Sequence, residues 1–384
     1  MKKKHPRTKV KRPALRRVLM GLTAGSMLCL TLAQGASPML ESAEAAPSRR
    51  ARSVVYVSDA AGLKLRQEDA EKIDQINYSF ALIENGKATG AHWQGIQTVS
   101  AYLRRNPHIT GVLAVGGWGA DGFSQACATE EGRIQLADSL LALMDEHGFT
   151  GIDVDWEYPG SSAAGIASSE DDVENWYKLL TLLREGLDKR TAATGRYHVL
   201  SVALGAGDEQ LSAVDGSRLD KLVDQAVVMA YDLCGFDKQT GHHAGLYPHD
   251  NRKTTGAYAV NSLIAGGLPA RKLLLGIPAY GRMWRQVTGS GNGLHQRAGT
   301  AGNKWLTFAD VQQLEAQGYT RYYDETAQAA WYFDGSNFVS AEDAQSLRYK
   351  AQWAIDRGLM GTAVWSYNQD DGSVITALHE SLLP

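Results

Sequence analysis

Cysteine is scarce in this sequence, with three in 384 residues. Cys29 lies in the N-terminal segment, so only Cys127 and Cys234 could form a bridge in the rest of the chain. This excludes a fold held together by a network of disulfides, such as many small secreted domains have. We expect both of these cysteines to be unpaired and buried.

Long apolar runs are also missing. The run from Val18 to Ala33 has 16 residues, fewer than the about 20 that span a bilayer. A strongly basic stretch precedes it, and SAEAAPS follows, in which Ala43 and Ala45 form an A-x-A cleavage site. These features are typical of a secretory signal peptide. We therefore expect residues 1–45 to be removed and the protein to be secreted to the extracellular space with no membrane attachment. A single-pass anchor is the alternative.

The chain has no excess of positive charge. It contains 39 Lys and Arg against 42 Asp and Glu. Removing the nine basic and two acidic residues of positions 1–45 leaves 30 basic and 40 acidic residues, a net charge of about −10. Because such a surface repels polyanions, we expect no nucleic-acid partner.

From Ser53 onward, short apolar runs alternate with longer helical patterns. Runs of this near-continuous apolar kind indicate parallel strands that are covered on both faces. The predicted strands are 53–58, 75–83, 109–117, 149–157, 198–206, 225–232, 272–280 and 359–367. Helical patterns lie between them, for example at 130–148 and 171–190.

Eight such units predict an α/β fold of the (β/α)8 TIM barrel type. A doubly wound open sheet is the alternative, but it requires a glycine-rich phosphate loop after its first strand, and VYVSDAAGLKL contains none.

The spacing of the predicted elements is uneven in one place. About 65 residues separate Tyr280 from the helical pattern at 346–358, and they carry mixed strand and turn signals. We predict a small α+β insertion domain at 282–345, after the seventh strand. The barrel then comprises residues 46–281 and 346–384.

The stretch GIDVDWEYP, residues 151–159, contains three acids two residues apart. Because alternate residues of a strand share one face, Asp153, Asp155 and Glu157 point the same way, about 6.6 Å apart from one to the next. In a barrel this face looks inward, and the C-terminal end of the strand opens at the active-site mouth. Burial and like charge raise the pKa of at least one of the acids. Glu157, nearest the mouth, is the expected proton donor.

A protonated acid of this kind suggests cleavage of a glycosidic bond. Two-carboxylate glycosidases place their carboxyls on opposite sides of the scissile bond, and neighbours on one strand cannot do this. Either a second carboxylate comes from elsewhere, or the substrate supplies the nucleophile. The carbonyl oxygen of an N-acetyl group at C2 could attack C1 and form an oxazolinium ion.

GIDVDWEYP resembles the D-x-x-D-x-D-x-E signature of family 18 glycoside hydrolases, the chitinases. Four other strand ends are similar to motifs of that family: AVGGWG (114–119), MAYDLCG (229–235), GIPAYGRMW (276–284) and AVWSY (363–367). The insertion resembles the α+β domain of one chitinase subgroup. The resemblance runs in the correct order from residue 53 to about residue 380.

The resemblance implies roles for individual residues. Glu157 would be the general acid and then the base that activates water. Asp155 would orient the acetamido N–H and stabilise the oxazolinium, while Asp153 would share a proton with it. Tyr231 would hydrogen-bond the acetamido carbonyl. Asp232 would hold the distorted sugar, Trp365 would form the floor of the sugar site, and the expected lining or packing groups are Trp118, Met229, Tyr280, Arg282, Tyr56 and Phe80.

The function implied is that of a secreted, monomeric chitinase that acts on chitin or chito-oligosaccharides with retention and needs no cofactor or metal. One alternative is an endo-β-N-acetylglucosaminidase acting on N-glycans or cell wall. Another is a non-catalytic chitin-binding lectin, which would be expected to lack the acid that is present at Glu157.

Two positions depart from the family motifs. Thr150 stands in place of the first Asp of the signature, and Ala114 stands in place of the Ser of S-x-G-G. Thr150 starts the strand, so we expect its effect to be structural. Ala114 lacks a hydroxyl that could hydrogen-bond Asp153, so we expect a change in the coupled titration of the acids.

GHHAGLYPHD places three histidines close together in the chain, at positions 242, 243 and 249. Because no Cys or carboxylate stands at ligand spacing, we do not expect a metal there. We expect this segment to shape one side of the substrate groove.

Overall fold

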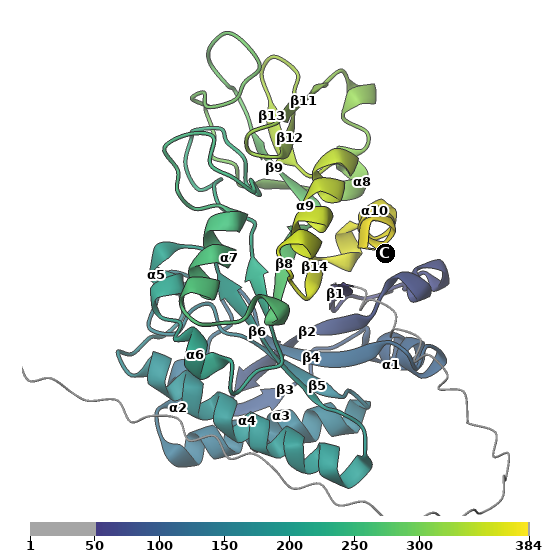
Figure 1. The fold of residues 1–384 in the computed structure, drawn as a ribbon, viewed down its shortest axis with the longest axis vertical. Helices are drawn as coiled ribbons and strands as arrows, with labels where there is room; N and C mark the ends of the chain where they lie inside the picture. The colour runs from purple at the N-terminus through teal and green to yellow at the C-terminus, as the bar shows by residue number, and fades with distance from the viewer. Residues whose placement is uncertain (1–50, 383–384) are drawn as a thin grey trace, which may run out of the picture. The chain divides into compact units, whose positions relative to one another are not determined.

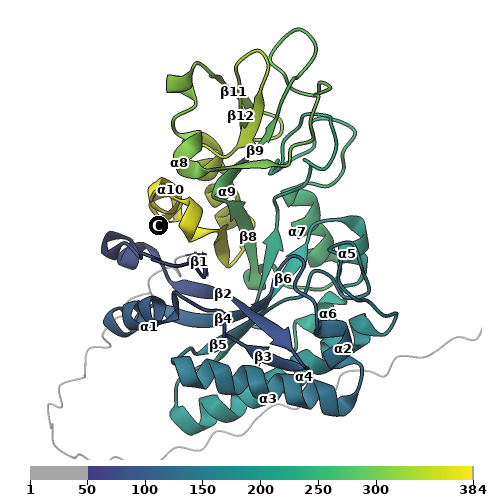
Figure 2. The same ribbon diagram turned by 180° about the vertical axis from the view of Figure 1, so that it is seen from behind.

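Eight parallel strands form a closed barrel in the computed structural model, which describes residues 51–382 of the chain (Figures 1 and 2). β1 pairs with both β2 and β14, which closes the sheet on itself. The predicted TIM barrel is therefore confirmed. The expected signal peptide, residues 1–45, lies outside the described residues. In chain order the barrel strands are β1 (Arg52–Ser58), β2 (Gln75–Glu84), β4 (Thr110–Gly116), β5 (Gly151–Asp155), β6 (Val199–Gly205), β7 (Gln225–Met229), β8 (Leu273–Pro278) and β14 (Gly361–Trp365).

Helices surround the barrel and connect its strands. Local chemistry sets their ends, as α3 illustrates: the Thr129 side chain accepts a hydrogen bond from the Gly132 N–H, and Gly148 ends the helix at φ 74°. The helices are α1 (Ile96–Arg105), α2 (Phe123–Cys127), α3 (Glu130–His147), α4 (Asp172–Thr194), α5 (Asp208–Ser212), α6 (Gly216–Leu219), α7 (Gly256–Ala265), α9 (Ala344–Asp356) and α10 (Ser373–Leu382). Short 3-10 turns are η1 (Gln67–Lys72), η2 (Ala270–Lys272) and η4 (Tyr367–Gln369).

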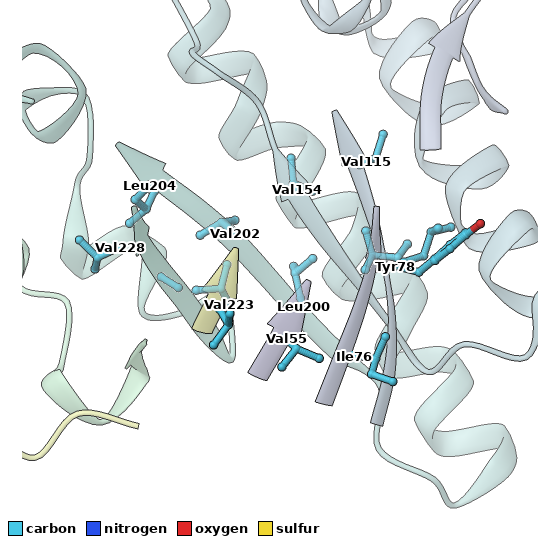
Figure 3. Close-up of a cluster of buried hydrophobic side chains, with 14 of the residues drawn as sticks. Val55, Ile76, Tyr78, Val115, Val154, Leu200, Val202, Leu204, Val223 and Val228 are labelled. Carbon is cyan, nitrogen blue, oxygen red and sulfur yellow. The ribbon is translucent and has the colours of Figure 1, made fainter. Parts of the chain in front are cut away.

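The main hydrophobic core lies between the barrel strands and these helices. Ile152, Val154 and Trp156 belong to it, together with residues of α3 and α4 such as Leu140 and Leu183. Figure 3 shows part of this layer, including Val154 on β5 and Leu200, Val202 and Leu204 along β6. Because side chains alternate along a strand, this packing turns Asp153 and Asp155 toward the barrel interior.

A second sheet follows the seventh barrel strand, as predicted. It is antiparallel, in the order β10-β9-β13-β12-β11, and only Ala279 separates its first strand from β8. In both ribbon views it stands beyond β8 and α9, away from α3 and α4. Its elements are β9 (Tyr280–Trp284), β10 (Lys304–Thr307), α8 (Phe308–Val311), η3 (Glu315–Gln317), β11 (Thr320–Asp324), β12 (Ala329–Phe333) and β13 (Phe338–Ala341).

Some element ends differ from the predicted ones. β5 ends at Asp155, so Glu157 lies just beyond the strand that was predicted to contain it. Tyr280 belongs to the insertion sheet and not to the seventh barrel strand. β3 (Lys87–Thr89), which was not predicted, forms a hairpin with the end of β2.

Cys127 and Cys234 are both free and buried, as expected. Within residues 51–382, no helix combines the length and the apolar character needed to cross a bilayer.

Candidate active site

A cavity of about 610 Å³ opens at the C-terminal ends of the barrel strands, beside the insertion domain. Two predicted residues, Asp153 and Tyr280, are fully buried and lie behind its wall. The other predicted site residues all line it: Tyr56, Phe80, Trp118, Asp155, Glu157, Met229, Tyr231, Asp232, Arg282 and Trp365.

Asp153 is the deepest of the three acids. One of its carboxyl oxygens, Oδ2, accepts a hydrogen bond of 2.9 Å from the Tyr56 hydroxyl. The other, Oδ1, has no direct partner of good geometry. Burial raises the pKa of Asp153 to about 6, although nearby Ser201, Tyr56 and Asn77 act in the opposite direction.

Asp155 and Glu157 lie progressively nearer the cavity. Burial, and then the charges of Glu157 and Asp153, raise the pKa of Asp155 well above its ordinary value. Burial raises the pKa of Glu157 to about 7, with a hydrogen bond from Tyr158 lowering it and the charge of Asp232 raising it. Asp155 and Glu157 therefore hold protons near neutral pH, and Glu157 can donate one into the cavity.

Asp232 has a different environment. Its backbone adopts a left-handed φ of 56°, and its Oδ1 accepts hydrogen bonds from the Tyr280 hydroxyl at 2.7 Å and from Arg282 Nε at 2.6 Å. Burial tends to raise the pKa of Asp232, but Arg282 and His243 hold it well below the ordinary value. Asp232 is therefore an ionised group held in a fixed position.

Tyr231 stands beside Asp232 and is partly exposed to the cavity that it lines. Burial, and then the charges of Asp155 and Glu157, raise the pKa of its hydroxyl well above the ordinary value. The hydroxyl therefore stays protonated and can donate a hydrogen bond to a ligand in the cavity.

Aromatic rings form the apolar surfaces of the cavity. Trp365 packs against Tyr56 and Phe80, with ring centroids 5.7 and 5.5 Å apart. At the entrance, Trp118 is 60% exposed. A flat apolar ring accessible from the cavity suits the apolar face of a sugar.

A further aromatic group surrounds Arg282. Trp305 is exposed, whereas Trp284 and Trp331, also in the insertion domain, are buried. Trp305 stacks on Tyr280 at 4.7 Å. The Arg282 guanidinium lies 5.1 Å from the Trp305 ring and 5.0 Å from the Phe236 ring. Phe236, which is 72% exposed, was missed because it follows the MAYDLCG motif in an irregular loop.

Other lining residues were missed for similar reasons. Tyr158 could have been predicted from the sequence because it follows Glu157 in the acid motif. Leu233 lies within the MAYDLCG motif, Ala203 on β6 and Gln210 on α5. The rest come from loops without a motif: Ala206, Gly207, Thr254 and Asn303.

The structure places both residues that depart from the family motifs, Ala114 and Thr150. Ala114 is the direct neighbour of Asp153 on β4 and is fully buried, so β4 offers Asp153 no hydroxyl. Thr150 precedes β5 and is buried, and its N–H donates to the Gly111 carbonyl.

The histidine segment contains a carboxylate contact that the sequence did not reveal. His242 Nε2 lies 2.9 Å from Asp324 Oδ2, and His249 contacts the same oxygen. His243 instead faces Asp232, at 3.5 Å. None of the three lines the cavity, and neither does any other residue of 241–250, so the expectation that this segment shapes the groove is not met there. Leu233 and Phe236, which precede the segment, form that part of the wall. Across residues 51–382, no group of His, Cys, Asp or Glu side chains is arranged to hold a metal ion.

Comparison with known proteins gives consistent matches. The chain is 31% identical to chitinase A1 of Niallia circulans over 331 residues, which cover 79% of this chain and 47% of that protein. It is 29% identical to chitotriosidase-1 of Mus musculus, over 82% of this chain and 71% of that protein.

A similar solved structure is a glycoside hydrolase family 18 N-acetylglucosaminidase from Paenibacillus barengoltzii. It is 34% identical, with a TM-score of 0.81, and the match covers 86% of this chain and 99% of that chain.

The family model described as glycosyl hydrolases family 18 matches residues 52–370. That span includes every barrel strand, the insertion domain and all the residues that line the cavity. The chain belongs to the family 18 glycosyl hydrolases.

Proposed function

We propose that this protein is a chitinase that hydrolyses β-1,4-linked N-acetylglucosamine chains with retention, by substrate-assisted catalysis. The observation that carries the proposal is the column formed by Asp153 and Asp155 on β5 and by Glu157 just beyond its end, with the proton-donating Glu157 in the cavity.

The one lining carboxylate outside this column, Asp232 in the loop after β7, is poorly suited to attack a sugar. Asp232 is the only other Asp or Glu among the lining residues. Its Oδ1 already accepts two hydrogen bonds, and Arg282 balances its charge. Because hydrogen bonding and ion pairing stabilise the carboxylate, they reduce its nucleophilicity. The acetamido group of the substrate is then the remaining internal nucleophile.

In the proposed reaction, Glu157 transfers its proton to the glycosidic oxygen while the C1–oxygen bond breaks. The acetamido carbonyl oxygen forms the new bond to C1, which gives an oxazolinium ion and a protonated leaving group. Asp155 stabilises the positive charge and accepts a hydrogen bond from the acetamido N–H. Tyr231 donates a hydrogen bond to the acetamido oxygen. Glu157, now a carboxylate, takes a proton from the water that attacks C1, which restores the acetamide and the acid with two inversions at C1.

Relatives named chitinase A1 and chitotriosidase-1 support the substrate class. A second candidate is N-acetylglucosaminidase activity on shorter substrates, favoured by the likeness to the Paenibacillus enzyme over nearly its whole length. Both functions use the same acetamido mechanism, so they differ in the length of sugar chain that the cavity binds.

The test is mass analysis of the products from a chitin hexamer, beside its fully de-acetylated equivalent. We expect cleavage of the acetylated hexamer and loss of at least about 100-fold in rate with the other substrate, since general acid catalysis alone supplies only part of the acceleration. Equal rates on both would refute acetamido participation. Glu157→Gln should lower kcat by a similar factor. Activity within tenfold of the wild type would show that Glu157 is not the general acid.

We also propose that the protein is secreted after removal of residues 1–45, on the basis of the basic, apolar and small-residue segments of its N-terminus. Expression of the full chain in an exporting host, followed by N-terminal sequencing of the protein in the medium, should give a chain starting at Ala46. Recovery only from the membrane, with the leader intact, would support the anchor instead.

A further inference from the structure

A group of polar side chains fills part of the barrel interior beneath Asp153. The residues between them on the same strands, such as Ile76, Leu200 and Val228, belong to the outer core between strands and helices (Figure 3). By alternation, the polar side chains therefore point inward. They are Gln75 and Asn77 on β2, Ser201 on β6 and Gln225 on β7, all fully buried.

These groups leave many polar atoms without a protein partner. The atoms concerned are Gln75 Oε1, Asn77 Nδ2, Asp153 Oδ1, Ser201 Oγ, and Gln225 Nε2 and Oε1. Buried polar atoms without a partner are rare in folded proteins, and the usual partner where side chains do not pair is ordered water. Ser201 and Asn77 lie close enough to Asp153 to lower its pKa through hydrogen bonding, but neither contact has good geometry. The barrel interior thus holds donors and acceptors from four strands whose hydrogen-bonding capacity is not fully used by protein groups.

The strand register places these side chains in a row. Asp153 is the direct neighbour of Ser201, and Ser201 is the direct neighbour of Gln225 on the next strand. On the other side, Gln75 Nε2 donates to Asn77 Oδ1 at 2.7 Å, and Asn77 lies close enough to Asp153 to influence its titration. Ala114, the neighbour on β4, offers no hydroxyl.

We propose that the polar side chains beneath Asp153 form an internal water site, and that this water, with Ser201, hydrogen-bonds the Asp153 oxygen that Tyr56 leaves free. A buried water needs two to four polar partners, and the atoms around this site provide them. Ser201 and Gln225 are then positioning residues for Asp153, and the hydroxyl absent at Ala114 is supplied from the opposite neighbouring strand.

The catalytic consequence rests on the proposed function. The titratable groups that face Asp153 are the Tyr56 hydroxyl on β1 and Asp155 on its own strand. The neighbouring positions Asn77, Ala114 and Ser201 carry no charge. Donors at the free oxygen favour the ionised form of Asp153. They therefore keep the shared proton available to Asp155, instead of fixing it on Asp153.

Crystallography of the protein without residues 1–45 tests the internal water site. At a resolution near 1.5 Å we expect water density within hydrogen-bond distance of Asp153 Oδ1 and Ser201 Oγ. The absence of any ordered water within hydrogen-bond distance of Asp153 Oδ1 would overturn the proposal. This result does not depend on which sugar the enzyme cleaves, so it stands even if chitin oligomers prove not to be substrates.

A matched pair of variants tests the effect on Asp153. Ser201 and Ser53 are both fully buried serines on barrel strands with an unpartnered hydroxyl, but Ser53 shares the face of Val55 and Val57, which pack in the outer core. Ser201→Ala should move the acid limb of kcat/KM toward higher pH by about one unit, the effect of one hydrogen bond to a charged group. Ser53→Ala should leave the limb in place, and Ser201→Thr should restore it.

Thermal unfolding of both alanine variants provides the structural control. The proposal is supported if the two variants lose the same amount of Tm while the acid limb of the kcat/KM profile shifts only in Ser201→Ala. If the limb moves equally in both variants, or in neither, the hydroxyl does not position Asp153 and the proposal is wrong.

Discussion

The Tyr158 hydroxyl gives the sharpest test of how the protonation of Glu157 controls activity. Burial raises the pKa of Glu157 to about 7, and the hydrogen bond from Tyr158 works against that rise. Tyr158→Phe keeps the ring and removes the bond, so the ionised form of Glu157 loses a stabilising contact. A hydrogen bond to a charged group contributes at least about 1.4 kcal/mol, or about one pKa unit. The pKa of Glu157 should therefore rise to about 8.

The assay is kcat/KM against pH with a soluble chito-oligosaccharide, because this parameter reports ionisations of the free enzyme. Glu157 acts in its protonated form, so activity is lost as pH rises through its pKa. At pH 8 a pKa of 7 leaves about one tenth of the enzyme protonated and a pKa of 8 leaves about half. Relative to its own plateau, the variant should thus be about fivefold more active than the wild type at that pH.

Tyr197→Phe is the matched control, because the Tyr197 hydroxyl also contacts a carboxylate, Asp224, but lies outside the cavity. It should leave the alkaline limb unchanged. An alkaline limb that stays in place in Tyr158→Phe, or moves to lower pH, would show that Glu157 is not the group that titrates there.

Three other predictions concern stability and binding. Lys350→Met should lower the free energy of unfolding by about 3–5 kcal/mol, because it leaves Glu342 buried without its ion-pair partner; in urea titration the double variant with Glu342→Met should recover most of the loss, and no recovery would contradict this account. Cys127 and Cys234 should both resist a thiol reagent in the native protein and both react in denaturant, since they are buried and unbridged; rapid native labelling would contradict their burial. Trp305→Ala should raise KM for long oligomers by about tenfold with a smaller effect on kcat, since an exposed ring provides stacking area and takes no part in proton transfer; an unchanged KM would exclude the ring from the binding surface.

The barrel and the acid column could be predicted because both depend on local periodicity. Buried parallel strands are mostly apolar, and the two-residue repeat of a strand decides that Asp153 and Asp155 share a face, which Glu157 follows just beyond the strand end. Neither inference requires knowledge of which distant segments pack together. The placement of most site residues follows from the same rule, since strand ends of a barrel gather at one rim.

Contacts between distant segments could not be predicted in this way. The bond between His242 and Asp324 joins residues 82 positions apart, and no spacing rule connects a barrel loop to the insertion sheet. Tyr280 shows a related limit. Its motif reads as one continuous strand, yet the chain passes from one sheet to another at Ala279. The apolar pattern does not change there, because both sheets bury their residues.

The closure of the barrel has a consequence for synthesis. β14 fills the gap between β8 and β1, and it carries Trp365, which lies against Tyr56 and Phe80 in the cavity. While the chain emerges from the ribosome, β1 and β8 remain open edges until Gly361–Trp365 has been made, and edges of this kind invite pairing with other chains. The insertion sheet precedes β14 in the chain, so it is available to fold before the barrel closes. A nascent chain therefore completes the contacts of Trp365 with Tyr56 and Phe80 only when β14 has been made, and the open edges of the barrel are covered at the same step.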